Sequence, residues 1–109
     1  MRNNVIIDKM IDIIEKLQSY VGENDYNSFS GNDMLVDACV FNLSQLGEVA
    51  NRIDSEFEEA HPEIPWRQIY GLCNRVIHDY EGINLILIWE IITEDLPDLV
   101  TKLKTINML

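Results

Sequence analysis

The sequence predicts an all-α fold: an up-and-down bundle of four main helices, the last of them divided at a proline. Apolar residues recur at steps of three and four through several long stretches, and no stretch shows the strict alternation typical of a half-buried strand. Five Gly and three Pro in 109 residues leave room for long helices. Because neither an internal repeat nor a linker is evident, we expect one helical domain over residues 1–109.

The first helix is expected to begin at a cap formed by Asn3 or Asn4 and to fade between Tyr20 and Gly22. Its core stripe has spacings of four, three and four, and consists of Ile6, Met10, Ile13 and Leu17. Residues 22–32 are rich in Gly, Asn, Asp and Ser, which predicts a loop, with two aromatic side chains available to hold it against the body.

A long second helix is expected from Asp33 to Glu59, capped by Asn32 or Ser30. Its apolar stripe is wide, which indicates contact on two sides, with the core and with a second copy of the chain. Gly47 lies in mid-helix at a cost of roughly 1 kcal/mol relative to Ala, and a close helix crossing would explain it. We interpret the neighbouring Glu48 as a solvated surface acid.

Pro62 and Pro65 should stop helical propagation, and between them and the second helix we expect His61 to be an exposed loop residue. A third helix should run from about Trp66 to Ile77 or His78. The chemistry-bearing side chains of the sequence gather in this third helix.

Asn84 can cap a fourth helix that begins with the run 85–92. The run is apolar nearly all round, so we expect it to be the most buried element. The pair Leu96-Pro97 should interrupt this helix and begin its last part.

The charge is strongly acidic, with 19 acids against 8 bases and a net charge of −11. A sequence-independent nucleic-acid binder usually carries a basic face, so an RNA-related role would need a local basic patch. The alternative is that the acidity aids solubility or complements a basic partner. Two lone cysteines form neither a disulfide framework nor a metal-ligand spacing, and no transmembrane run or signal pattern is present, so we expect a cytoplasmic protein without metal or other cofactor.

Asn74 and His78 are spaced to lie one turn apart on the third helix, with Arg75 beside His78. A histidine next to an amide and a guanidinium can act as acid or base, while the cation stabilises negative charge on a phosphorane. These are the parts of a metal-independent ribonuclease, in which the 2′-hydroxyl of the RNA attacks. The alternative is a histidine that merely caps the helix C-terminus.

The segment 66–99 resembles the HepT-like branch of the HEPN (higher eukaryotes and prokaryotes nucleotide-binding) superfamily. The Gly47-Glu48 pair also fits this branch. The matching features within the segment are Trp66, Ile69-Tyr70-Gly71-Leu72, Asn74, His78-Asp79-Tyr80, Ile83-Asn84, Trp89 and Leu96-Pro97.

The resemblance implies a small all-α homodimer whose two motif helices face a shared cleft. It further implies a metal-independent endoribonuclease that acts as the toxin of a toxin–antitoxin pair and is neutralised by an MNT-type nucleotidyltransferase. In such pairs the antitoxin can transfer AMP to the tyrosine two residues after the motif histidine, and that position here is Tyr80.

The family motif begins with an arginine that is followed directly by Asn, and here Cys73 occupies that position before Asn74. A thiol supplies neither a permanent charge nor the five donors of a guanidinium. Arg75 lies about 200° around the helix from this point and Arg67 lies too far back. Direct pairing of Cys73 with His78, as nucleophile and base, is geometrically poor. Three hypotheses stay open: a ribonuclease with His78 as acid/base, a catalytically inactive binding partner of the nucleotidyltransferase, and a helical dimer of unrelated use.

Overall fold

The structure of the chain, a computed structural model, describes residues 2–78 and 84–107. The elements, in order, are α1 (Arg2–Val21), α2 (Tyr26–Ser30), α3 (Asp33–Ala50), α4 (Ser55–Ala60), α5 (Trp66–His78), α6 (Leu85–Glu90), the π-helical stretch η2 (Ile91–Asp95) and α7 (Leu96–Asn107). No strand occurs within the described ranges. The predicted all-α bundle is therefore confirmed, with α1, α3, α5 and the α6–η2–α7 run as its main helices.

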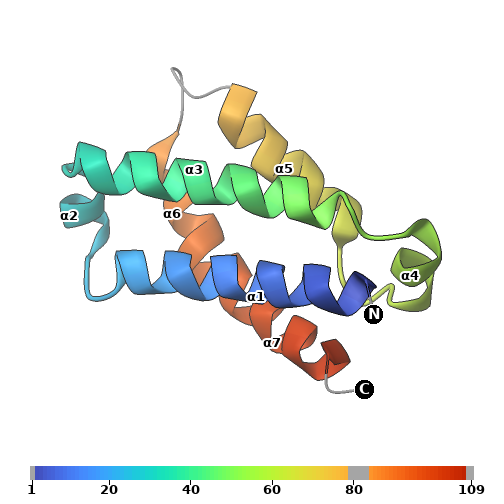
Figure 1. Cartoon of the computed structure of the whole chain (residues 1–109). Coiled ribbons are helices and arrows are strands. Elements are labelled where there is room, and N and C mark those ends of the chain that lie inside the picture. Colours follow the sequence, from blue (N-terminus) through green and yellow to red (C-terminus); the bar gives the residue numbers. More distant parts are fainter. Residues whose placement is uncertain (1, 79–83, 108–109) are drawn as a thin grey trace.

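Helix α3 lies between α1 and α5 and packs against both, while the α6–η2–α7 run crosses behind them (Figure 1). The buried apolar side chains form one cluster that draws on all four main helices. In α1 the predicted stripe holds: Ile6, Met10 and Leu17 are buried, and Ile13 is partly buried against the core. The amphipathic pattern thus correctly predicted which side of α1 faces the core.

The start of α1 differs from the prediction, because the helix already includes Arg2 and neither Asn3 nor Asn4 caps it. Asn3 instead reaches the segment after α3: its Nδ2 donates to Asp54 Oδ2 (3.4 Å), and its Oδ1 accepts from the Asp54 N–H (3.4 Å). Arg2 adds an ion pair to the same carboxylate at 3.3 Å. Asn3 is thus engaged with a residue distant in sequence and does not cap its own helix.

Residues 22–32 were predicted to be a loop, but Tyr26–Ser30 form the short helix α2. A capping box stabilises it: the Ser28 N–H donates to Asp25 Oδ1 (2.8 Å), and the Asp25 N–H donates to Ser28 Oγ (3.1 Å). Phe29 is fully buried, with its ring centroid 5.2 Å from that of Trp89. The aromatic anchoring of this segment is as expected, whereas its backbone is more ordered than its composition indicates.

The second predicted helix is divided, since α3 ends at Ala50 and α4 begins at Ser55. Ile53, in the turn between them, is buried in the core, and Asp54 has an extended backbone (φ −66°, ψ 142°). The apolar periodicity continues through this turn, so periodicity alone gives no sign of the break. At the other end of α3, Asn32 is the cap, with its Oδ1 accepting from the Leu35 N–H at 3.1 Å.

The last helix is divided where expected, and the π-helical stretch shows how. The Leu96 N–H donates to the carbonyl of Ile91, five residues back, instead of four. Pro97 has no N–H, and in a regular α-helix its ring would clash with the carbonyl of residue 93, so the wider π turn accommodates it. Asn84 caps α6 as predicted, its Oδ1 accepting from the Ile86 N–H at 3.0 Å.

The run 85–92 is not the most buried element. Ile88, Ile91 and Ile92 are in the core, but Ile86 is 49% exposed. Glu90 is also exposed, and the other side chains of the run are only partly buried. The run packs against α2 on one side and continues into η2, which leaves part of its circumference open to solvent. The prediction that this run is the most buried element was therefore wrong, although nearly all of its residues are apolar.

Candidate functional site

The crossing of α3 and α5 brings Gly47 against Cys73. A Cβ atom placed on Gly47 would lie 2.7 Å from the Cβ of Cys73 and 3.8 Å from the carbonyl oxygen of Tyr70. The first of these distances is shorter than van der Waals contact permits, so only glycine fits at residue 47. The close crossing predicted from the mid-helix glycine is confirmed, and its partner is the cysteine at the position of the motif arginine.

Cys73 is buried, with 2% of its surface exposed. Loss of solvation raises the pKa of its thiol to about 12, and a hydrogen bond with the Gly47 backbone offsets only part of that rise. The thiol is therefore neutral at physiological pH, since thiolate forms only near its pKa. It supplies neither a cation nor an activated nucleophile, which agrees with the geometric argument against a Cys–His pair.

The opposite side of α5 faces solvent. Arg75 is exposed and Asn74 half-buried, so Cys73 and Arg75 lie on different sides of the helix, as the 200° separation requires. The backbone of α5 is helical as far as His78, which sets residues 74 and 78 one turn apart. The side chain of His78 and all of Tyr80 lie outside the described residues.

The start of α5 is fixed by aromatic packing and one partly buried hydrogen bond. The indole Nε1 of Trp66 donates to the carbonyl of His61 at 3.0 Å, and the Trp66 ring lies 6.1 Å from that of Phe57. His61, expected to be an exposed loop residue, is half-buried with its ring 4.5 Å from Phe57. The sequence before Pro62 gave no sign of this packing, because Phe57 belongs to helix α4, which the prediction had merged with α3.

Charge separates α5 from the other main helices. It contains two arginines and no Asp or Glu, whereas α1, α3 and the α6–η2–α7 run each contain at least three acids. Because the net charge of the chain is −11, any RNA role requires a local basic patch. Arg67 and Arg75 form this patch. The motif spacing excluded Arg67 as the motif arginine, but counting charges helix by helix would have found it.

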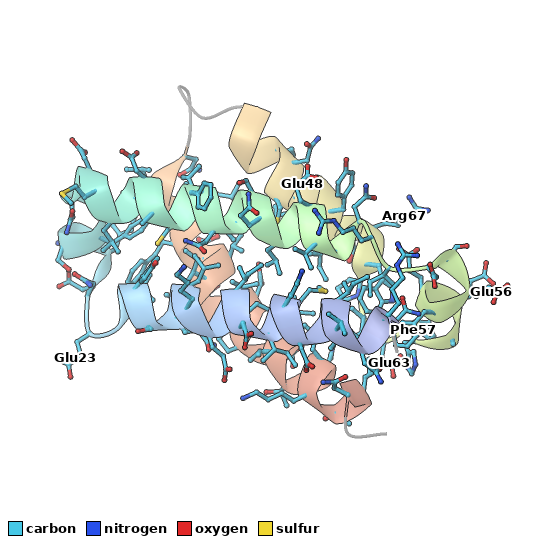
Figure 2. The ribbon with its side chains drawn as sticks, viewed as in Figure 1. Glu23, Glu48, Glu56, Phe57, Glu63 and Arg67 are labelled. Carbon is cyan, nitrogen blue, oxygen red and sulfur yellow. The ribbon has the colours of Figure 1, made fainter. Side chains whose placement is uncertain are left out.

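Glu48 is exposed on α3 near the crossing, as interpreted from the sequence. Figure 2 shows Glu48 on the α5 side of α3, and Arg67 near the start of α5. Arg67 approaches Glu58 Oε2 with its Nε at 3.7 Å, but 83% of the arginine side chain remains exposed. Such a long, solvated ion pair restrains the guanidinium little.

A cavity of about 390 Å³ opens on the other side of α5, towards η2 and α7. Cys73 lines it together with apolar side chains, Glu94, Asp95, Asp98 and Lys102. Lys102 pairs with Asp98 at 3.1 Å, so the lining keeps a net negative charge, which repels a phosphate backbone. The outer face of α5, not this cavity, is therefore the candidate surface for RNA.

The described part of the chain holds no group of three or more His, Cys, Asp or Glu side chains arranged to bind a metal ion. Among the described helices, none is both long enough and apolar enough to cross a membrane.

The chain is thus a small helical protein in which a polar motif helix, α5, packs on a glycine of the neighbouring helix α3. The family model described as "HepT-like: Ribonuclease HepT-like" matches residues 10–106. The chain belongs to this HepT-like ribonuclease family, as the resemblance of its motif helix had indicated.

Three curated relatives agree with this assignment. "Putative RNase MJ1380" of Methanocaldococcus jannaschii is 38% identical over 92 residues, 84% of this chain and 81% of the relative. "Putative RNase TTE0752" of Caldanaerobacter subterraneus is 35% identical over 81 residues, 74% of this chain and 72% of the relative. "Probable ribonuclease HepT" of Thermococcus cleftensis is 27% identical over 101 residues, covering 93% and 92%. No solved structure gives a significant match.

Proposed function

We propose that this chain is the toxin of a HEPN/MNT-type toxin–antitoxin pair, a metal-independent endoribonuclease whose cleavage is slowed by Cys73. The observation that carries the proposal is the outer side of α5, the one acid-free main helix in a chain of net charge −11, with residues 74 and 78 one turn apart. Membership in a ribonuclease family supports RNA as the substrate.

In the proposed reaction, His78 removes the proton from the 2′-hydroxyl and later returns one to the leaving oxygen. Asn74 orients the reacting phosphate by hydrogen bonding. The charge-stabilising donor expected at residue 73 is missing, because Cys73 is buried and neutral. By analogy with the loss of an oxyanion-hole donor, this absence lowers the rate about a hundred- to a thousandfold.

The second candidate is an inactive binding partner of the nucleotidyltransferase, and the burial of Cys73 favours it. Both candidates share a homodimer and the MNT-type partner, with Tyr80 as AMP acceptor. The exposed Met34 and Phe41 on α3 support the homodimer, since the second side of this wide apolar stripe has no cover within the described chain.

Cleavage of single-stranded RNA in the presence of EDTA separates the two candidates. We expect slow cleavage by the wild type, none by His78→Ala, and faster cleavage by Cys73→Arg. A wild type no faster than His78→Ala would exclude the enzyme and leave the binding partner.

The partner proposal has its own test. The chain should co-purify with the product of the neighbouring gene, and mass spectrometry should find AMP added to Tyr80 after incubation with that product and ATP. A Tyr80→Phe variant should stay unmodified. If no nucleotidyltransferase is encoded beside the chain and none co-purifies, the toxin–antitoxin assignment is wrong.

A further inference from the structure

Gly71 is a glycine with no structural reason to be one. It lies in the middle of α5, where a glycine costs roughly 1 kcal/mol relative to alanine. A Cβ atom placed on it would meet nothing within 4 Å, and its backbone does not need a positive φ, since the described chain has that conformation only at Gly22. Neither packing nor conformation explains Gly71, in contrast to Gly47.

Gly71 stands between two arginines at equal spacing. Arg67, Gly71 and Arg75 follow one another at four-residue steps, and all three are exposed. Steps of four keep residues on one side of a helix, and the two arginine Cα atoms lie roughly 12 Å apart along the axis at 1.5 Å per residue. The result is a smooth, uncovered stretch of helix with a guanidinium at each end.

The chemistry of this row matches a phosphate backbone. Guanidinium groups bind phosphate oxygens through paired N–H donors, and an uncovered glycine lets a ligand approach the helix closely. No carboxylate lies within α5, although acids outnumber bases more than twofold in the chain as a whole. Glu58 of α4 approaches the Nε of Arg67 at 3.7 Å, but 83% of the arginine side chain stays exposed to a ligand. Half-buried Tyr70 and Asn74 lie beside the row, where unstacked bases of a single strand can reach them.

We propose that the row Arg67–Gly71–Arg75 is the track on which single-stranded RNA crosses α5, with its backbone passing directly over Gly71. This inference rests on the proposed ribonuclease function and names positioning residues outside the His78–Asn74 pair. Arg67 and Arg75 hold phosphates, while the missing side chain at residue 71 lets the strand lie against the helix.

The test measures binding separately from cleavage. Fluorescence anisotropy of a labelled single-stranded RNA is recorded with the full chain and with Arg67→Gln, Arg75→Gln and Gly71→Leu. The slope of log affinity against log salt should fall by about one for each arginine removed. Gly71→Leu should lower affinity about tenfold without changing that slope, because it blocks approach without removing charge.

Two variants on other helices serve as matched controls. Lys9→Gln removes one exposed cation from α1, and Thr105→Leu adds one exposed leucine to α7. Both should bind RNA as the wild type does, and sedimentation should give every variant the same mass. If the controls weaken binding as much as the α5 variants, the track is wrong. It is equally wrong if Gly71→Leu alters self-association together with RNA affinity.

Different results would contradict the track and the ribonuclease proposal. Cleavage by the wild type with equal RNA affinity in all α5 variants would overturn the track alone. RNA binding that depends on the row, without cleavage by any variant, would overturn the enzyme and keep the track. A wild type that does not bind RNA would overturn both.

Discussion

The two sides of helix α5 differ in how closely they are packed. Two glycines, one beside each side, show this difference most clearly. On the inner side, Gly47 of α3 is held to glycine by the Cβ of Cys73, which leaves no room for a side chain. On the outer side, Gly71 has open space where its Cβ would be. The same residue type is thus explained by packing in one place and, in our proposal, by an external ligand in the other.

This difference bears on Cys73. The residue that departs from the family motif lies on the inner side, where a small, neutral side chain suits a close helix crossing. Arg67 and Arg75, which support RNA binding, lie on the outer side. Packing at the helix crossing and RNA binding by these two arginines are therefore separable by mutation.

The largest expected effect comes from filling the inner side. Gly47→Leu should lower the free energy of unfolding by about 3 kcal/mol, because the helices must separate to admit the new side chain. Gly71→Leu should leave stability unchanged or slightly higher, since leucine is the better helix former. Urea denaturation of both variants measures the difference, and equal stabilities would contradict the crossing geometry.

Cys73→Arg should come next, with a loss of about 2 kcal/mol relative to wild type. The guanidinium must leave water at a position that is 2% exposed, and the carboxylates in the neighbouring cavity compensate only in part. Cys73→Ala should cost less, since it removes one atom and no charge is buried. Thermal unfolding of the pair provides the measurement; an arginine variant as stable as the alanine variant would contradict the burial.

The buried thiols should make the fold sensitive to alkali. Burial raises the pKa of Cys39 to about 11 and that of Cys73 to about 12, from 9.0. A raised folded pKa stabilises the fold fully below the unfolded pKa, and this contribution declines as pH rises from there to the folded value. Between pH 9.0 and 11 the free energy of unfolding should therefore fall as the pH rises, with a contribution from each thiol.

The double variant Cys39→Ala, Cys73→Ala isolates this effect, since lysines and tyrosines titrate in both proteins. The difference in urea midpoint between wild type and variant should change with pH only above pH 9. A difference that stays constant across that range would show that the thiols ionise as readily in the folded chain as in the unfolded one.

The smallest effect is expected on the outer side. Arg67→Gln should change stability by less than about 0.5 kcal/mol, because its ion pair with Glu58 is long and the arginine is 83% exposed. A stability loss of several kcal/mol in this variant, seen by urea denaturation, would show that Arg67 holds the fold and would remove the contrast between the two sides.

The sequence predicted the helices and the crossing because those features are local in the chain. The stripe of α1, the caps Asn32 and Asn84 and the role of Gly47 all follow from spacing within one helix. The turn after Ala50 escaped prediction because its causes are distant: Asp54 is held by Arg2 and Asn3, about 50 residues away. The helix of residues 26–30 was hidden by a composition that favours turns.

The candidate site was predictable in part for the same reason. The spacing of Asn74 and His78 and the separation of Cys73 from Arg75 follow from helical geometry. The burial of Cys73 depends on α3, which spacing within α5 cannot reveal. The row Arg67–Gly71–Arg75 was not predicted, because none of its residues is unusual by itself. Only the structure shows the open space around Gly71 that suggests a role for it.

The π-helical stretch before Pro97 also sets the rotational phase of the C-terminal third of the bundle. A π turn takes more residues than the 3.6 of an α turn, so it rotates everything that follows. Deleting one residue there would turn Leu99 and Leu103 by about 100°, away from the core they fill. The chain length between Trp89 and Pro97 is thus as constrained as the residues themselves.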